Sequence, residues 1–137
     1  MTGLRGAEDL ARFIRENYSG RVVEVGAGHL GDVARQLSGL EVVATDIVAR
    51  QVGELSIEAD DIFDPTPELY RGACLIYSIR PPVEMQPAMG RLALSIGADL
   101  IIRPLGDEIV SLPGLKRRLV NLGEARFYLY QARIRPL

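Results

Sequence analysis

A glycine-rich segment near residue 25 joins an acidic side chain to two closely spaced glycines, in the order Glu24-Val25-Gly26-Ala27-Gly28. The run 21–25 is β-branched and predicts a strand, and the apolar spacing over 33–37 predicts a helix after the glycines. At such a junction, glycines let a nucleotide approach the backbone closely, and free amides at the helix start donate to its phosphate or carboxylate. We therefore predict that Gly26 and Gly28 contact a nucleotide cofactor.

Carboxylates accompany three successive predicted strands. Asp46 ends the second strand twenty residues after Gly26, and Asp61, followed by Ile62, comes after the third. A carboxylate at the position of Asp46 accepts hydrogen bonds from ribose hydroxyls, although a turn or capping role is the alternative. Glu24 lies within an otherwise apolar strand, where burial requires a polar partner. We predict cofactor contacts for Glu24, Asp46, Asp61 and Ile62.

A second distinctive segment, Tyr77-Ser78-Ile79-Arg80-Pro81-Pro82, follows the fourth predicted strand. Ligands of open parallel sheets bind at this edge, so Ser78 and Arg80 are our candidate catalytic residues on the acceptor side. An arginine accepts no hydrogen bond, and it suits an anionic substrate or the carboxylate of a cofactor. The alternative is that the prolines start the next helix and the arginine is only solvated.

The elements that position these residues alternate between strand and helix. Apolar or β-branched runs predict strands at 21–25, 41–45, 55–59, 73–78 and 100–103. Helical spacing is found at 7–18, 33–37, 68–70 and 85–96. Residues 119–130 predict an antiparallel hairpin, and the short stretch 47–55 predicts a stunted crossover helix. Together these elements predict a three-layer Rossmann-like α/β fold, with a mostly parallel sheet and a C-terminal antiparallel hairpin.

Length and composition narrow the class of protein. The 137 residues, 47% of them apolar and 25% charged, predict a single globular domain over 1–137. No apolar run is long enough to cross a membrane, and the N-terminus carries no secretory pattern, so we expect a cytoplasmic protein. Cys74 lies in an apolar run and predicts a buried thiol. The acidic stretch 60–64 lacks the spacing of a calcium loop, so no metal site is predicted.

The net charge and its distribution indicate which partners the chain can bind. The net charge of −2 argues against non-specific binding of nucleic acid. The cluster Lys116-Arg117-Arg118 predicts a solvated rim before a strand, with a nucleic-acid contact as the alternative. His29, the only histidine, predicts a tolerated loop residue and no catalytic group. We expect a small-molecule nucleotide cofactor as the ligand, an acceptor that the sequence does not identify, and a monomer or homodimer.

The glycine segment resembles the motif E/D-x-G-x-G of S-adenosylmethionine methyltransferases. In that family the acid helps to place the amino-acid moiety of the cofactor, which implies this role for Glu24. Asp61 matches the place where the family binds the adenine amino group. Leu30 departs from the motif, because it occupies the position of the usual third glycine, and this leaves NAD as the alternative cofactor.

Longer segments resemble an archaeal group, uncharacterised protein family 0146. The segments are 22–26, 43–46, 59–63, 75–82 and 127–130. The resemblance implies a compact methyltransferase-like Rossmann fold and no particular reaction. Our first hypothesis is an S-adenosylmethionine-dependent methyltransferase. The alternatives are a catalytically inactive nucleotide-binding or partner-subunit module of the same fold, and an NAD-binding redox protein.

Overall fold

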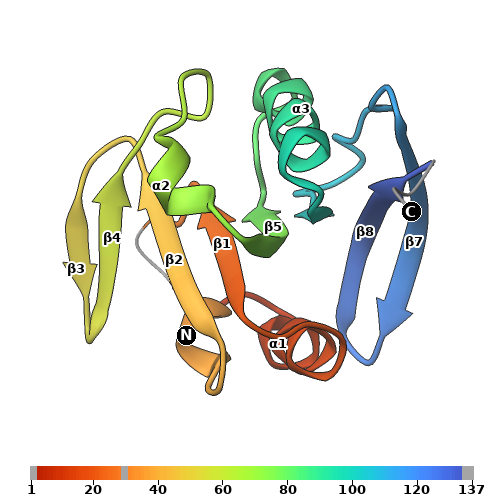
Figure 1. The fold of residues 1–137 in the computed structure, drawn as a ribbon. Coiled ribbons are helices and arrows are strands. Elements are labelled where there is room, and N and C mark those ends of the chain that lie inside the picture. The colour runs from red at the N-terminus through yellow and green to blue at the C-terminus, as the bar shows by residue number, and fades with distance from the viewer. Residues whose placement is uncertain (1–2, 29–30, 134–137) are drawn as a thin grey trace.

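A computed structural model describes residues 3–28 and 31–133 of the chain (Figure 1). The α-helices are α1 (Ala7–Asn17), α2 (Pro67–Tyr70) and α3 (Gln86–Ile96), and two 3-10 turns are η1 (Ala34–Gln36) and η2 (Val83–Met85). The first strands are β1 (Arg21–Val25), β2 (Glu41–Asp46), β3 (Arg50–Val52) and β4 (Leu55–Ala59). They are followed by β5 (Ala73–Ile79), β6 (Asp99–Arg103), β7 (Leu115–Leu122) and β8 (Ala125–Ala132).

The described strands form one sheet of eight, in the order β3-β4-β2-β1-β5-β6-β8-β7. Strands β4, β2, β1, β5 and β6 pair in parallel, whereas β3 pairs antiparallel with β4, and β8 antiparallel with both β6 and β7. The predicted α/β class, the mostly parallel sheet and the terminal hairpin are confirmed. The carboxyl ends of β4, β2 and β1 are therefore neighbours, which is the arrangement the acidic residues require.

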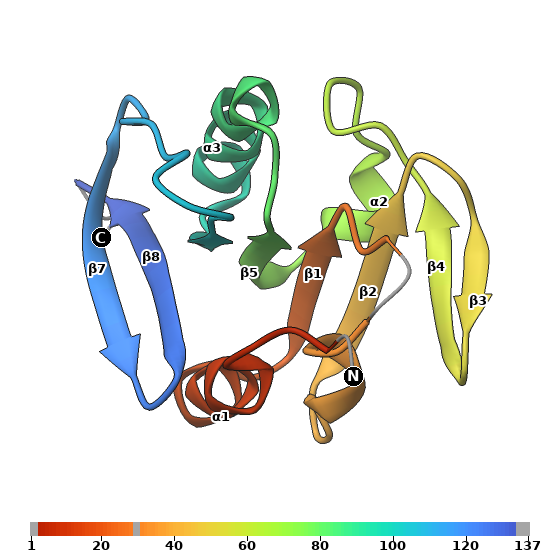
Figure 2. The same cartoon turned by 180° about the vertical axis from the view of Figure 1, so that it is seen from behind.

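Helices cover the two faces of the sheet and make three layers (Figures 1 and 2). On one face, α1 buries Leu10 and Ile14 against a cluster that includes Val22, Tyr77 and Phe127. On the other face, α3 buries its residues in a second cluster, which includes Met89, Ile76, Leu100 and Tyr130. Strand β5 is buried along most of its length because it lies between both layers. No helix in the described ranges is both long and apolar enough to span a membrane.

The expected stunted helix between β2 and β4 is wrong, because this stretch contains β3. Val52 pairs with Leu55 around a two-residue turn at Gly53 and Glu54, and Gly53 has φ +60°. A glycine in the left-handed region is typical of such tight hairpin turns. The eight residues between Asp46 and Leu55 are too few for a helical crossover. The chain instead runs along the outer edge of the sheet as β3, turns at Gly53 and returns as β4, which pairs with β2 in parallel.

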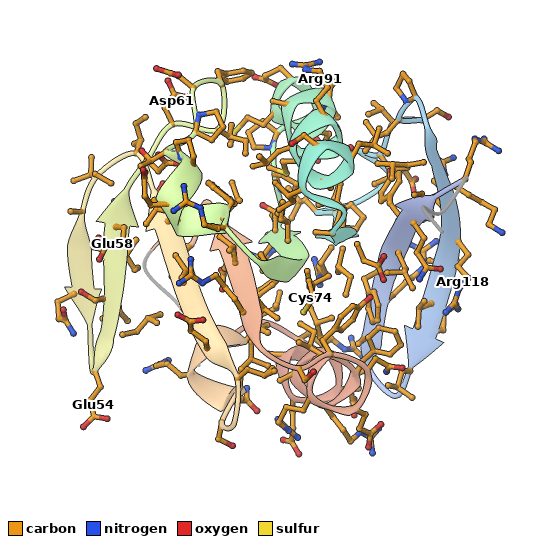
Figure 3. All side chains as sticks on the ribbon, in the orientation of Figure 1. Glu54, Glu58, Asp61, Cys74, Arg91 and Arg118 are labelled. Carbon is orange, nitrogen blue, oxygen red and sulfur yellow. The ribbon has the colours of Figure 1, made fainter. Side chains whose placement is uncertain are left out.

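Three further expectations need correction. The helix predicted over 33–37 is only the single 3-10 turn η1, because the chain enters β2 already at Glu41. The aligned helix amides expected after the glycines are therefore missing from the described residues there. The basic cluster Lys116-Arg117-Arg118 lies inside β7 and not before it, and all three residues are exposed; Figure 3 labels Arg118 on this strand. Cys74 is half-buried, and its thiol donates to the carbonyl of Ser19 at 3.1 Å.

Candidate functional site

The glycine loop leaves β1 and crosses toward the end of β2. The amide of Ala27 donates to the carbonyl of Thr45 at 2.8 Å, and the amide of Gly28 donates to Oδ2 of Asp46 at 3.2 Å. Gly26 and Gly28 have φ of +71° and +63°, a region that disfavours other residues. A Cβ at Gly28 would meet nothing within 4 Å, so its positive φ, and not a lack of space, explains the glycine here.

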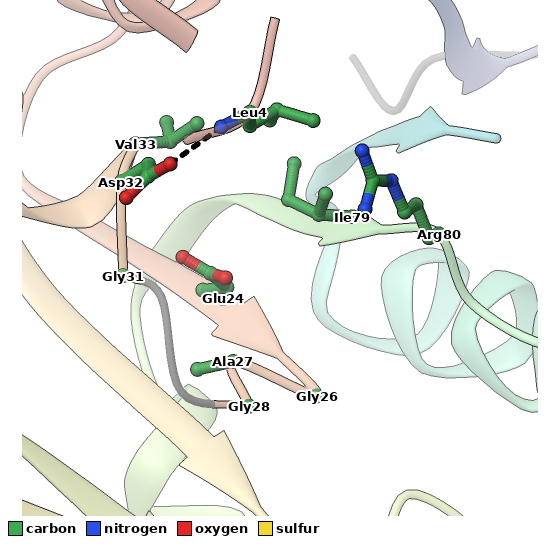
Figure 4. A pocket seen from close by; sticks show the side chains of 10 residues that line it. All are labelled: Leu4, Glu24, Gly26, Ala27, Gly28, Gly31, Asp32, Val33, Ile79 and Arg80. Carbon is green, nitrogen blue, oxygen red and sulfur yellow. Dashed lines mark hydrogen bonds between the residues drawn. The ribbon is translucent and has the colours of Figure 1, made fainter. Parts of the chain in front are cut away.

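A first cavity of about 170 Å³ lies on the α1 side of this loop (Figure 4). Gly26 and Gly28 line it together with Glu24 of β1 and Arg80, which follows β5. The remaining lining residues are Leu4, Ala27, Gly31, Asp32, Val33 and Ile79. Four of the predicted site residues are thus brought together from two neighbouring strands and the loop between β1 and β2.

Glu24 is buried at the base of this cavity, with 3% of its surface exposed. The hydroxyl of Tyr77 donates to Oε1 of Glu24 at 2.8 Å, which supplies the polar partner that the buried acid was expected to need. Burial raises the pKa of Glu24 to about 7, and nearby Asp32 adds to the rise, while the Tyr77 hydrogen bond opposes it. A cation in the cavity would favour the charged carboxylate.

Asp32 is a second acid at the cavity that the sequence interpretation missed. Its Oδ2 accepts a hydrogen bond of 2.6 Å from the amide of Leu4, and its Oδ1 lies 3.3 Å from the guanidinium of Arg35. Figure 4 shows Leu4 and Asp32 meeting at one end of the cavity. The available signal was an acidic residue directly after Gly31, but the contact with Leu4 depends on the path of the N-terminal segment.

A second cavity, of about 420 Å³, lies at the carboxyl ends of β2 and β4. Its lining includes the predicted cofactor residues Asp46, Asp61 and Ile62, and it shares Gly26 with the first cavity. The other lining residues are Val25, Thr45, Ile47, Asp60, Phe63 and Met85. Gly26 therefore lies where the two cavities adjoin, and the predicted cofactor residues line one or the other.

The carboxylates of the second cavity differ in the hydrogen bonds and ion pairs that they already make. Asp46 accepts from the amides of Gly28 and Ile47, and its Oδ2 lies 3.3 Å from the guanidinium of Arg50. Asp60 accepts from the amide of Thr66 and the hydroxyl of Tyr70, which fixes the loop after β4. Asp61 is exposed, and its Oδ1 accepts from the amide of Phe63 at 2.9 Å. An ionised carboxylate has about four acceptor positions, so Asp46 and Asp61 keep capacity for a ligand.

Apolar side chains flank these acids. Ile47 and Phe63 are 68% and 60% exposed, although large apolar side chains are usually buried. Ile62 is buried beneath them, and Met85 is half-buried, so Met85 lines the cavity in addition to packing against the core. A cavity with apolar walls and two carboxylates at its rim suits a flat base joined to a ribose.

The two candidate catalytic residues have different surroundings. Ser78 is 1% exposed, and its hydroxyl donates to the carbonyl of Val25 at 2.7 Å, so its side chain ties β5 to the end of β1. Arg80 is exposed and lines the first cavity. The sequence pattern did not distinguish the buried role of Ser78 from the accessible position of Arg80.

Other predicted features fall outside this site. His29 and Leu30 lie outside the described residues. Within the described ranges, no group of three or more His, Cys, Asp or Glu side chains could hold a metal ion. In the basic cluster, the guanidinium of Arg117 lies 5.5 Å from the ring of Tyr128, at the far end of the sheet from the glycine loop.

Fold and cavities define a class: a Rossmann-like α/β protein with the fold of S-adenosylmethionine methyltransferases. It resembles an S-adenosyl-L-methionine methyl transferase from Silicibacter pomeroyi DSS-3, with TM-score 0.60, 16% identity, and 93% of this chain and 90% of that one covered. A 16S rRNA methyltransferase, RmtF, in complex with S-adenosyl-L-homocysteine is similar with TM-score 0.58 and 17% identity, over 93% of this chain and 62% of that one. Likeness at this level of identity concerns the fold.

The chain belongs to the uncharacterised protein family UPF0146, whose model matches residues 7–132. A UPF0146 protein from Methanothermobacter thermautotrophicus is 48% identical over 119 residues, which are 84% of this chain and 86% of the relative. A second, from Archaeoglobus fulgidus, is 42% identical over 123 residues, which are 88% and 91% of the two chains. The predicted family membership is confirmed.

Proposed function

We propose that this protein binds S-adenosylmethionine across the two adjoining cavities and transfers its methyl group to an acceptor. The observation that supports the proposal is that the two cavities that adjoin at Gly26 have different linings. The first cavity is lined by the two acids Glu24 and Asp32, and the second has apolar walls with acids that suit a ribose and a base. A ligand with a cationic end and an adenosine end matches this division.

The residues present fit the cofactor. Glu24 and Asp32 would attract the ammonium group of the methionine end, and this cation would offset the burial that raises the pKa of Glu24. Asp46 would accept from the ribose hydroxyls. Asp61 would accept from the adenine amino group, and Ile62 and Phe63 would contact the base. Gly26 and Gly28 have no side chains and would leave room for the part of the ligand that joins its methionine end to its adenosine end.

When bound, the cofactor would supply a methyl group on a cationic sulfur, which an acceptor with a lone pair can take up while the sulfur keeps the electron pair of the broken bond. Such a displacement depends mainly on alignment, so few side chains need to take part in proton transfer. In this chain, Ser78 holds the ends of β1 and β5 in place, and Arg80 faces the open side of the first cavity.

The same observations disfavour NAD. A dinucleotide places its pyrophosphate at the N-terminus of the helix after the glycine loop, where aligned amides bind the anion. Here the described residues contain only the 3-10 turn η1 at that place. Glu24 and Asp32 would also repel a pyrophosphate in the first cavity, whereas they attract an ammonium group.

The test is isothermal titration calorimetry with S-adenosylhomocysteine and, separately, with NADH. The proposal predicts saturable binding of S-adenosylhomocysteine and binding of NADH at least tenfold weaker. No heat with millimolar S-adenosylhomocysteine, or tighter binding of NADH, would refute it. Cofactor binding without transfer of a labelled methyl group to an archaeal extract would instead support the inactive module.

A further inference from the structure

Two arginines lie at the carboxyl ends of neighbouring strands: Arg80 directly follows β5 and lines the first cavity, and Arg103 ends β6. Ile79 of β5 is the register partner of Arg103 of β6, and the amide of Arg80 donates to the carbonyl of Arg103 at 2.6 Å. These contacts come from adjacent strand ends, so the backbone of the sheet fixes the spacing of the two residues. The pair is therefore a built feature of the carboxyl edge of the sheet.

Both residues belong to the side of the sheet that carries the first cavity. Arg103 is two residues after Ile101, so its side chain lies on the same face as Ile101, which packs in one cluster with Tyr77 and Leu4. Arg80 lines the cavity directly. In the view of Figure 4, Ile79 separates the guanidinium of Arg80 from the carboxylate of Glu24. Arg80 and Glu24 thus line different parts of the first cavity.

The pair holds two like charges together at a cost. Partial burial and the neighbouring Arg80 both lower the pKa of Arg103. Within residues 3–28 and 31–133, neither guanidinium has a carboxylate within 4.0 Å, and Arg103 donates only to the carbonyl of Pro104, at 2.9 Å. An anion between them would relieve the repulsion.

The backbone supports the same interpretation. Arg80 has φ +55° and is the one residue other than glycine with positive φ in the described part of the chain. A left-handed conformation is strained for a residue other than glycine, and such strain is concentrated at ligand sites. This conformation lies directly after the end of β5, at a residue that lines the cavity.

We propose that Arg80 and Arg103 bind a phosphate group of the methyl acceptor, which makes the acceptor a phosphorylated compound. This inference rests on the proposed function, because it assigns a substrate class to the same site. Guanidinium groups bind phosphate oxygens through paired hydrogen bonds, and two of them match a phosphate better than one. The pair fixes the position of the acceptor and takes no part in the bonds that form and break.

The test follows the side-chain Nε–H signals of the arginines by NMR during titration with inorganic phosphate, with and without saturating S-adenosylhomocysteine. Signals of Arg80 and Arg103 should shift saturably. The affinity should fall at least fivefold in Arg80→Gln and in Arg103→Gln, and it should be partly kept in Arg103→Lys. Arg71→Gln removes an exposed arginine away from the cavity and should leave the titration unchanged. Equal effects of all variants, or no shift of the two signals, would overturn the proposal.

Two further experiments identify the source of the phosphate and test whether the two arginines bind the cofactor instead. If ribose 5-phosphate binds as tightly as a short oligouridylate, the phosphate belongs to a small metabolite. If the oligouridylate binds tenfold more tightly, the phosphate belongs to RNA. Either result supports phosphate binding by the two arginines when Arg103→Gln abolishes the binding. If both glutamine variants keep the phosphate response but lose S-adenosylhomocysteine affinity tenfold, the arginines bind the cofactor carboxylate and the inference is wrong. Failure of the wild-type protein to bind S-adenosylhomocysteine refutes the proposed function alone, because the phosphate titration without cofactor is independent of it.

Discussion

The hydroxyl of Tyr77 donates a hydrogen bond of 2.8 Å to Oε1 of Glu24, and both side chains are buried. The two residues are register partners in β5 and β1, so the sheet itself brings them together. Because Glu24 lines the first cavity, this pair joins the core of the fold to the candidate cofactor site. It connects the stability of the fold to ligand binding.

Removal of the hydroxyl should therefore affect both properties. Tyr77→Phe leaves a buried carboxyl group without its donor, so we expect the free energy of unfolding to fall by about 1 to 3 kcal/mol in urea denaturation. The pKa of Glu24 should rise above 7, because the hydrogen bond that lowers it is lost. Tyr130→Phe is the control, since it removes a hydroxyl that donates to Val110 away from the cavity. If both variants bind S-adenosylhomocysteine with the same pH dependence, the pair has no role in the site.

Stability should fall as the pH rises through the range in which Glu24 ionises. Its pKa is about 7 in the folded protein against an ordinary value of 4.5, so the folded state binds more protons between these values. The stabilisation of the neutral form is fully present below pH 4.5 and is lost as the pH passes 7, in total roughly 3 kcal/mol. Urea denaturation of wild type and Glu24→Gln from pH 4.5 to 8 measures the difference. A difference that stays constant over this range would contradict the burial argument.

Cofactor affinity should change in the opposite direction with pH. A cationic ammonium group requires the ionised carboxylate, so the affinity for S-adenosylhomocysteine should rise between pH 6 and 8 in the wild-type protein. Glu24→Gln should bind more weakly, and its affinity should be independent of pH over this range. Calorimetry in two buffers of different ionisation enthalpy also reports proton release on binding. Parallel pH profiles for both proteins would exclude Glu24 from ligand binding.

Asp46 should contribute to binding more than to folding. Asp46→Ala removes the predicted ribose acceptor and the contact to the amide of Gly28, and we expect a loss of about 1 to 3 kcal/mol in S-adenosylhomocysteine binding, or 5- to 150-fold in Kd. Glu58→Ala on the adjacent strand removes an exposed acid of the same charge and is the control. Equal affinities of the two variants would assign Asp46 to the alternative turn role.

A matched pair of glycine variants separates backbone strain from blockage of the site. Gly26 and Gly72 have φ of +71° and +75°, and a Cβ at either one meets no atom closer than 3.9 Å. Alanine at each should therefore cost a similar 1 to 2 kcal/mol of stability. Only Gly26→Ala projects a methyl group where the two cavities adjoin, so only this variant should lose cofactor affinity at least tenfold. Similar binding by both variants would show that the passage is not used.

The sequence was sufficient to predict which site residues lie together where their positions depend only on the order of the strands. Glu24, Asp46 and Asp61 were predicted together because each accompanies a strand of a parallel sheet, and the carboxyl ends of such strands share one edge. The turn at Gly53 was missed although its signal was present, a glycine between two β-branched or aliphatic residues that pair across it. The short distance between β2 and β4 correctly indicated that a full crossover helix does not fit.

Contacts between distant segments could not be predicted. The pairing of Tyr77 with Glu24 joins residues 53 apart and depends on strand register, which alternation alone does not specify. The same limit applies to Arg103, whose position beside Arg80 requires the register of β5 and β6. The buried hydrogen bond of Ser78 also follows from that three-dimensional order and not from the residue type.

A crystal structure of the protein with S-adenosylhomocysteine would show whether one ligand spans both cavities. We expect the amino group of the ligand beside Glu24, its ribose hydroxyls at Asp46 and its adenine between Asp61 and Phe63. Density for the adenosine at another place, or a methionine end directed away from Glu24, would contradict it.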